Sequence, residues 1–138
     1  MLIFLSLFHI LTTPLVPPTR KTQFIVEIQN IRTATGSVRI GLYKPCDGFP
    51  DKCKPNESKH VTAAKGSVQA VFEVDPGEYA LAVYHDVNNN GKIDMRLFIP
   101  REPYGFSNNV RPRFSAPKFA ECRVRVGQEA KTVTIRVD

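Results

Sequence analysis

The chain has 138 residues, of which 42% are hydrophobic and 23% are charged, with 11 Pro, 8 Gly, 3 Cys and no Trp. This length and composition fit one globular domain and exclude a second full domain. The formal net charge is +6, and because Arg20 is the first charged residue, loss of an amino-terminal segment would leave that charge unchanged.

The chain begins with an uncharged apolar stretch over residues 1–16. This stretch is shorter than the roughly 20 residues that span a bilayer, and its length suits a secretory signal. However, no Lys or Arg precedes it, and no small-x-small cleavage site follows it. A first core strand or a buried amino-terminal helix is the alternative. We expect residues 1–21 to be a leader, residues 22–138 to be the domain, and the protein to be exported to the periplasm or outside the cell.

From residue 24 onward, apolar and polar residues alternate with a period of two, which indicates short strands separated by turns. No apolar pattern of helical spacing extends over three turns, so a parallel sheet with crossover helices is not expected. About seven strands predict a single antiparallel, immunoglobulin-like β-sandwich with one long irregular loop. The expected strands cover 24–29, 38–42, 68–74, 79–84, 122–126 and 133–137, with a weaker one at 59–63.

The strand at 79–84 is apolar on both faces apart from two tyrosine hydroxyls, so we expect it to be central. It follows a Pro76-Gly77 turn, and Tyr79 opens it. In sandwiches, a Tyr at this place can direct its hydroxyl back to upstream backbone. A plain half-buried aromatic is the alternative.

The central strand leads into a segment that resembles the first two thirds of a calcium loop of the EF-hand type. Oxygen side chains occupy its first, third, fifth and ninth positions, Gly the sixth, and the seventh supplies a main-chain carbonyl. These positions are Asp86, Asn88, Asn90, Asp94, Gly91 and Lys92.

The twelfth position of that loop is Leu97 rather than the bidentate Glu. With two carboxylates, we expect calcium to bind with a dissociation constant of about 10⁻⁴ to 10⁻³ M. Glu102, or a carbonyl beyond it, would complete the ligand set. The alternative is a metal-free Asn-Gly turn in which Asp86 and Asn88 bond to backbone.

Residues 95–120 show little alternation and contain four prolines. A compact domain seldom carries about 25 irregular residues without a use for them. Tyr104 and Phe106 would hold the segment against the sandwich. A lid over one end and a well-packed loop remain equal alternatives. Hydrogen-bonding groups are offered by Ser107, Asn108 and Asn109.

Three segments in order resemble the signatures of the bacterial domain-of-unknown-function family 2141. They are Pro-Gly-Glu-Tyr-Ala at 76–80, the loop at 85–94, and Pro-Arg-Glu-Pro-Tyr-Gly-Phe-Ser-Asn-Asn at 100–109. The resemblance covers residues 24–138. It implies a small exported protein with a transthyretin-like or carboxypeptidase-regulatory-like β-sandwich, and no established activity. Besides the residues of the predicted ion site, it marks His85, Tyr104, Gly105, Phe106, Ser107, Asn108 and Asn109 as signature positions.

Cys46 and Cys53 enclose six residues with Gly and Pro, a span that a disulfide can close in an oxidising compartment. The spacing does not suit a metal site, because there is no second pair of cysteines. Cys122, on an expected strand, is interpreted as a buried free thiol.

No catalytic fingerprint occurs in the chain. His85 and Asp86 are neighbours on a strand end, so their side chains diverge. A hydrolase that uses Asp94 and Glu102 is the third hypothesis, since calcium ligation or surface exposure explains both residues more simply. We therefore expect no enzyme activity.

Positive charge is concentrated between residues 96 and 125. Such a surface could bind acidic polysaccharide or lipid headgroups, and an ordinary solvated face is the alternative. Nucleic acid is not expected, because exposed aromatic residues are not interleaved with the charges. We expect an exported binding or accessory module of unknown ligand, stabilised by calcium, with an anionic envelope polymer as the alternative partner. The residues proposed for anion binding are Arg96, Arg101, Arg111, Arg113 and Lys118.

Overall fold

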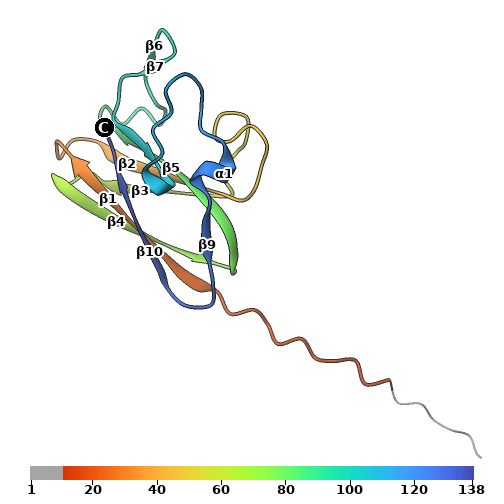
Figure 1. Cartoon of the computed structure of the whole chain (residues 1–138). Helices are drawn as coiled ribbons and strands as arrows, with labels where there is room; N and C mark the ends of the chain where they lie inside the picture. Colours follow the sequence, from red (N-terminus) through yellow and green to blue (C-terminus); the bar gives the residue numbers. More distant parts are fainter. Residues whose placement is uncertain (1–10) are drawn as a thin grey trace, which may run out of the picture.

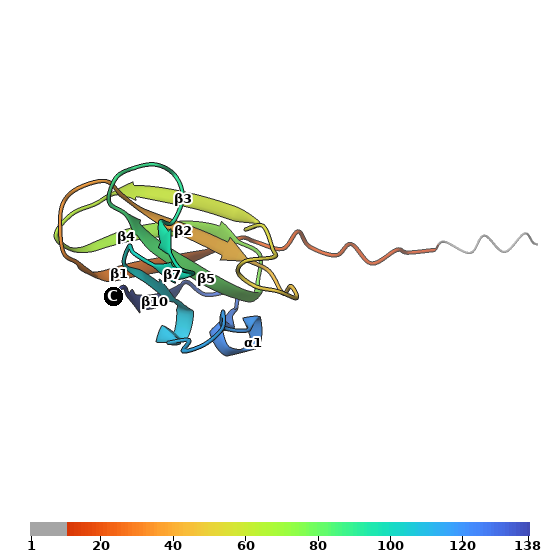
Figure 2. The same cartoon turned by 90° about the horizontal axis from the view of Figure 1, so that it is seen from above.

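The alternating segments form two open β-sheets in the computed structural model, which describes residues 11–138 (Figures 1 and 2). One sheet has three strands in the order β10 (Lys131–Arg136), β1 (Thr22–Ile31) and β4 (Gly66–Val74). The other has the order β3 (Glu57–Thr62), β2 (Ser37–Tyr43), β5 (Gly77–Asp86) and β8 (Tyr104–Phe106), and β9 (Val124–Val126) also pairs with β5.

Shorter elements occupy the connection between β5 and β9. A hairpin of β6 (Met95–Arg96) and β7 (Ile99–Pro100) stands beyond the two sheets in Figure 1. A 3₁₀ turn, η1 (Ser107–Asn109), follows β8, and a single helical turn, α1 (Phe119–Cys122), precedes β9. The predominantly β fold agrees with the sequence.

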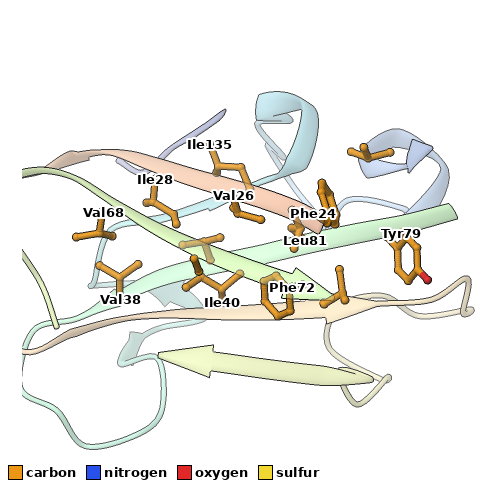
Figure 3. Packing of buried hydrophobic residues seen from close by; sticks show 14 of the residues in the cluster. Phe24, Val26, Ile28, Val38, Ile40, Val68, Phe72, Tyr79, Leu81 and Ile135 are labelled. Atoms are coloured by element: carbon orange, nitrogen blue, oxygen red, sulfur yellow. The ribbon is translucent and has the colours of Figure 1, made fainter. Parts of the chain in front are cut away.

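The main core lies between the inward faces of both sheets (Figure 3). Alternate residues of each strand are buried because successive side chains of a strand point to opposite faces. Phe24 and Phe72 are the largest of these side chains and have no exposed surface. Removing such apolar area from water contributes roughly 25 cal/mol per Å². Each sheet also contributes aliphatic residues, among them Val26, Ile28, Val38, Ile40, Val68, Leu81 and Ile135.

Strand β5 is central, as its two apolar faces predicted. It pairs with β2 on one side and with both β8 and β9 on the other. At its start, the Tyr79 hydroxyl donates a hydrogen bond of 2.6 Å to the carbonyl of Asp75. The turn and the strand are therefore fastened to each other by the side chain that the sequence indicated.

Two predictions about the sheets were wrong in detail. The sheets are not wholly antiparallel, because β1 and β10 pair in parallel, with Phe24 opposite Lys131. Residues 11–138 also contain ten strands rather than seven, since β6, β7 and β8 lie in the segment that showed no alternation. Strands of two or three residues are too short to show a period. The expected strand at 122–126 begins at Val124, after α1.

A second, smaller cluster lies beneath the disulfide loop. Cys46 and Cys53 are bonded, as predicted. Phe49, in the loop between them, packs edge-on against Tyr43 with ring centroids 4.9 Å apart. Cys122 is buried in the same cluster and is free. Burial, and to a smaller extent the Glu121 charge, raises the pKa of this thiol to about 12.

The amino-terminal segment lies apart from the sheets. Residues 1–10 of the expected leader lie outside the described residues, and residues 11–20 are exposed. Within residues 11–138, no helix is long and apolar enough to cross a membrane. In the described part of the chain, every strand lies within residues 22–138.

Candidate functional site

The outward face of the five-stranded sheet carries two ordered rows of side chains. The register places Gly41 opposite Ala82, and Ala82 opposite Phe106. The next row runs His60, Arg39, Tyr84 and Tyr104 across the same four strands. Gly41 has no side chain and Ala82 has only a methyl group. The surface of the sheet is therefore recessed at these two positions, relative to the larger side chains around them.

This low area is the floor of a hollow of about 800 Å³. That volume lies within the range of small-molecule sites, roughly 300 to 1,000 Å³. The β6–β7 hairpin forms one wall, and residues 112–117 form another. The irregular segment between β5 and β9 thus surrounds a surface of the sheet instead of packing flat on it.

Arg39 and Asp86 form an ion pair at the edge of the hollow. Arg39 Nε lies 2.7 Å from Asp86 Oδ2, and the aspartate side chain is fully buried. Its other partners are the N–H of Gly91, 2.8 Å from Oδ2, and the N–H of Asn90, 3.1 Å from Oδ1. Burial by itself raises the pKa of Asp86, but the hydrogen bonds from Arg39, Gly91 and Asn90 together hold it below its ordinary value.

The rest of the 86–94 loop is closed by its own side chains. Asn88 Nδ2 and Asn90 Nδ2 donate to the two oxygens of Asp94, at 2.7 and 2.8 Å. The side-chain oxygens of Asn88 and Asn90 accept the N–H groups two residues further on. Gly91 has φ +82°, a conformation that residues with a Cβ rarely adopt.

Glu102 fastens both ends of this loop. Its Oε1 accepts the N–H of Val87 at 3.1 Å, and its Oε2 accepts the N–H of Asp94 at 3.0 Å. The residue is only 7% exposed. Glu102 was predicted to complete an ion site from outside the loop, and the structure does bring it to the loop, bonded to backbone.

The residue types suit calcium, because the side chains of residues 88, 90 and 94 all carry oxygen and lie within hydrogen-bond distance of one another. The groups that Asn88 and Asn90 direct toward Asp94 are their amide nitrogens, so an ion would require both amides to turn. The charge balance is less favourable, because the Arg39 guanidinium neutralises one of the two loop carboxylates. Within residues 11–138, no three His, Cys, Asp or Glu side chains gather as a metal-binding group. Calcium binding by this loop stays a prediction.

Comparison with known proteins bears on the resemblance noted from the sequence. A family model described as "Uncharacterized protein conserved in bacteria (DUF2141)" matches residues 26–134. The chain belongs to this family. A search of curated proteins and a search of solved structures each found no match.

The DUF2141 signature at 104–109 has a structural use in this chain. Ser107 Oγ accepts the N–H of Leu81 at 2.9 Å, and Asn108 Nδ2 donates to the carbonyls of Glu121 and Arg123. Asn109 Oδ1 accepts the N–H of Arg136. These three side chains join β5, α1 and β10 and thereby hold η1 against the sheets.

Two further signature residues of this DUF2141 member are fixed by close packing. Gly105 lies so near β10 that a Cβ would come within 2.6 Å of the Arg136 carbonyl. His85 is buried, and its Nε2 lies 2.7 Å from the carbonyl of Thr35. Because a carbonyl can only accept, Nε2 carries the proton. Both residues therefore support the fold around the loop.

Among the basic residues proposed for anion binding, Arg111 differs from the other four in its contacts. Arg111 donates to the carbonyls of Tyr104 and Arg136 and pairs with Asp138 at 2.8 Å. Arg96, Arg101, Arg113 and Lys118 are exposed. Among residues 11–138, none of these four takes part in an ion pair.

Sequence reasoning missed Arg39 and the hollow. Arg39 is a single charged residue in the alternating segment 38–42. The alternation shows that it lies on the outward face of the strand, but it does not show which residue it contacts. The hollow depends on Gly41 and Ala82 being opposite each other. That pairing is a matter of register, which one sequence does not show.

Proposed function

We propose that this protein is an exported binding module whose ligand site is the hollow on the outward face of the five-stranded sheet. The observation that carries the proposal is the row of small residues, Gly41 opposite Ala82, within walls that leave about 800 Å³. The proposal includes a transthyretin-like or immunoglobulin-like sandwich as the scaffold. The Cys46–Cys53 disulfide is compatible with export to an oxidising compartment.

The lining favours a small amphipathic anion. Arg39 uses only Nε for Asp86, and within the described residues its two terminal nitrogens donate no hydrogen bond. Such a guanidinium edge suits a carboxylate, sulfate or phosphate. His60 lies beside it in the same row, while Tyr84, Tyr104 and Phe106 supply apolar surface for the rest of the ligand.

We propose binding without catalysis. The two carboxylates of the hydrolase hypothesis are both engaged, since Glu102 accepts two backbone N–H groups and Asp94 accepts two amide groups. A general acid or base must reach the reacting group with a free oxygen. These contacts support a structural role for both residues.

The test compares ligands and variants by calorimetric titration. Decanoate carries an apolar chain and a carboxylate, and decanol carries the same chain without charge. We expect decanoate to bind one per chain and about tenfold more tightly, a difference of about 1.4 kcal/mol. Ala82→Leu fills the floor of the hollow and should abolish binding. Gln69→Leu, which adds a similar side chain on the outward face of β4, should leave binding unchanged. Equal binding by both variants would contradict the proposal.

A calcium ion in the 86–94 loop forms a second part of the proposal. The meeting of Asn88, Asn90 and Asp94 supports it, and the Arg39 pair is the reason to expect weak affinity. Binding would stiffen the loop that lies between β5 and the wall formed by the β6–β7 hairpin.

A further inference from the structure

Most of the large exposed apolar side chains of the domain lie around the mouth of the hollow. At the tip of the β6–β7 hairpin, Leu97 is 84% exposed and Phe98 is 96% exposed. On the opposite wall, Phe114 is fully exposed. All three line the same hollow. Single exposed apolar residues are common on soluble proteins, but a group of large ones on one rim indicates an interaction surface.

The backbone at the hairpin tip is unfavourable for the residues that occupy it. Arg96 pairs with Ile99, which leaves Leu97 and Phe98 as a two-residue turn. Their φ angles are +49° and +64°. Turns with two positive φ angles prefer Asn-Gly, and bulky side chains there are strained. The chain thus accepts strain to place two large apolar side chains in solvent, and such outliers mark functional sites.

The same rim is positively charged. Arg96 and Arg101 flank the hairpin and Arg113 precedes Phe114, and all three are exposed. Neither nearby carboxylate contacts them directly, since Glu102 accepts backbone N–H groups and Asp94 accepts asparagine amides. In residues 11–138, no ion pair involves these three arginines.

We propose that this rim docks on the surface of an anionic lipid bilayer. Apolar side chains at a loop tip can enter the boundary between headgroups and acyl chains, while arginines beside them contact phosphate groups. An anionic bilayer therefore offers an apolar environment to the hairpin tip and negative charge to the arginines around it. Phe98 and Phe114 would enter from the two walls, and Arg96 and Arg113 would remain at headgroup level. Docking needs no ligand in the hollow, so it is independent of the proposed binding of amphipathic anions.

The chain contains no Trp, so one introduced Trp reports on its own position alone. In the full-length protein, we would replace Phe98→Trp and, as a matched control, Gln128→Trp in the exposed turn before β10. Both carry the same amino-terminal segment, so any binding by that segment affects them equally. Because both positions are exposed, neither substitution should change Tm.

We expect the emission of Phe98→Trp to shift to the blue, and brominated acyl chains to quench it, with phosphatidylglycerol-containing vesicles but not with pure phosphatidylcholine. The Gln128→Trp control should not respond. Adding Arg96→Gln or Arg113→Gln to the reporter should each raise the half-saturating lipid concentration about fivefold, whereas Lys65→Gln should not.

Three outcomes would overturn the proposal. The first is no blue shift with anionic vesicles. The second is an equal shift at position 128, which would assign the contact to another part of the chain. The third is a blue shift that depends on protein concentration and not on lipid, accompanied by dimers in light scattering, which would assign the rim to a second copy of the chain.

Discussion

Removing the charge of Asp86 should be the most costly single isosteric change in the 86–94 loop. In Asp86→Asn, one oxygen becomes an NH₂ group and faces a donor, because Arg39 and Gly91 donate to Oδ2 and Asn90 donates to Oδ1. The Asp86 carboxylate is fully buried, so water does not reach its oxygens, whereas the Arg39 side chain keeps 29% of its surface exposed. Breaking a buried pair costs about 3 to 5 kcal/mol, and we expect about 3 because Asn keeps one acceptor.

Urea unfolding followed by far-ultraviolet circular dichroism measures the loss in the free energy of unfolding. In a thermal melt of the same variant, Tm should fall by roughly 10 °C or more. Arg39→Met keeps the aliphatic stem without the charge. In a double-mutant cycle, the two substitutions together should cost less than the sum of the single ones, by about 1.5 to 3 kcal/mol. A loss below about 0.5 kcal/mol for Asp86→Asn, the size of an ordinary surface effect, would refute the importance of the pair.

The Arg39–Asp86 pair also predicts the direction in which the stability of the domain changes with pH. Because the pKa of Asp86 is lower in the folded state than its ordinary value of 3.8, the folded chain binds fewer protons in that range. The stabilisation is therefore fully present above the unfolded-state pKa and is lost as pH falls through the folded-state pKa. The stability difference between wild type and Asp86→Asn should be constant from about pH 5 to 7 and shrink below about pH 4. A difference that does not change with pH would contradict the assignment.

Three other predictions concern separate parts of the domain. Tyr79→Phe should cost about 1 kcal/mol in urea unfolding, because it removes a hydroxyl donor, and Tyr84→Phe should cost less, because no hydrogen bond of its hydroxyl occurs within residues 11–138. A thiol reagent should leave the native chain unmodified and label one cysteine, Cys122, in denaturant; labelling of the native chain would contradict the burial of this thiol. Calcium at about 10 mM should raise Tm by a few degrees if its dissociation constant is about 1 mM, and Asp94→Asn should remove the shift. An equal Tm in calcium and in chelator would exclude the ion.

The sequence predicted those features that depend on neighbouring residues. The strands at 24–29 and 68–74, the central β5 and the contact of Tyr79 with the preceding turn all follow from local alternation and turn residues. The 46–53 disulfide follows from spacing. Each of these patterns lies within a few consecutive residues, where a single sequence carries enough information.

The remaining features depend on partners far away in the sequence. Arg39 and Asp86 are 47 residues apart, and Gly41 meets Ala82 only because β2 and β5 pair in one register. The sequence shows that residues 107–109 offer hydrogen-bonding groups, but only the structure shows that their amides and hydroxyl bond to β5, α1 and β10. A single chain does not distinguish a polar side chain that meets solvent from one that meets distant backbone.

The parallel pairing of β1 with β10 also determines when the domain can finish folding. Strand β1 is the middle strand of its sheet, and one of its two neighbours, β10, lies about 100 residues further along the chain. Asp138 in addition exchanges two backbone hydrogen bonds with Tyr104 of the other sheet. A chain that is still being synthesised therefore holds β1 with one edge open until residues 131–136 have been made. Contacts of such long sequence separation form slowly, so the polypeptide stays unfolded well after its first strands are made.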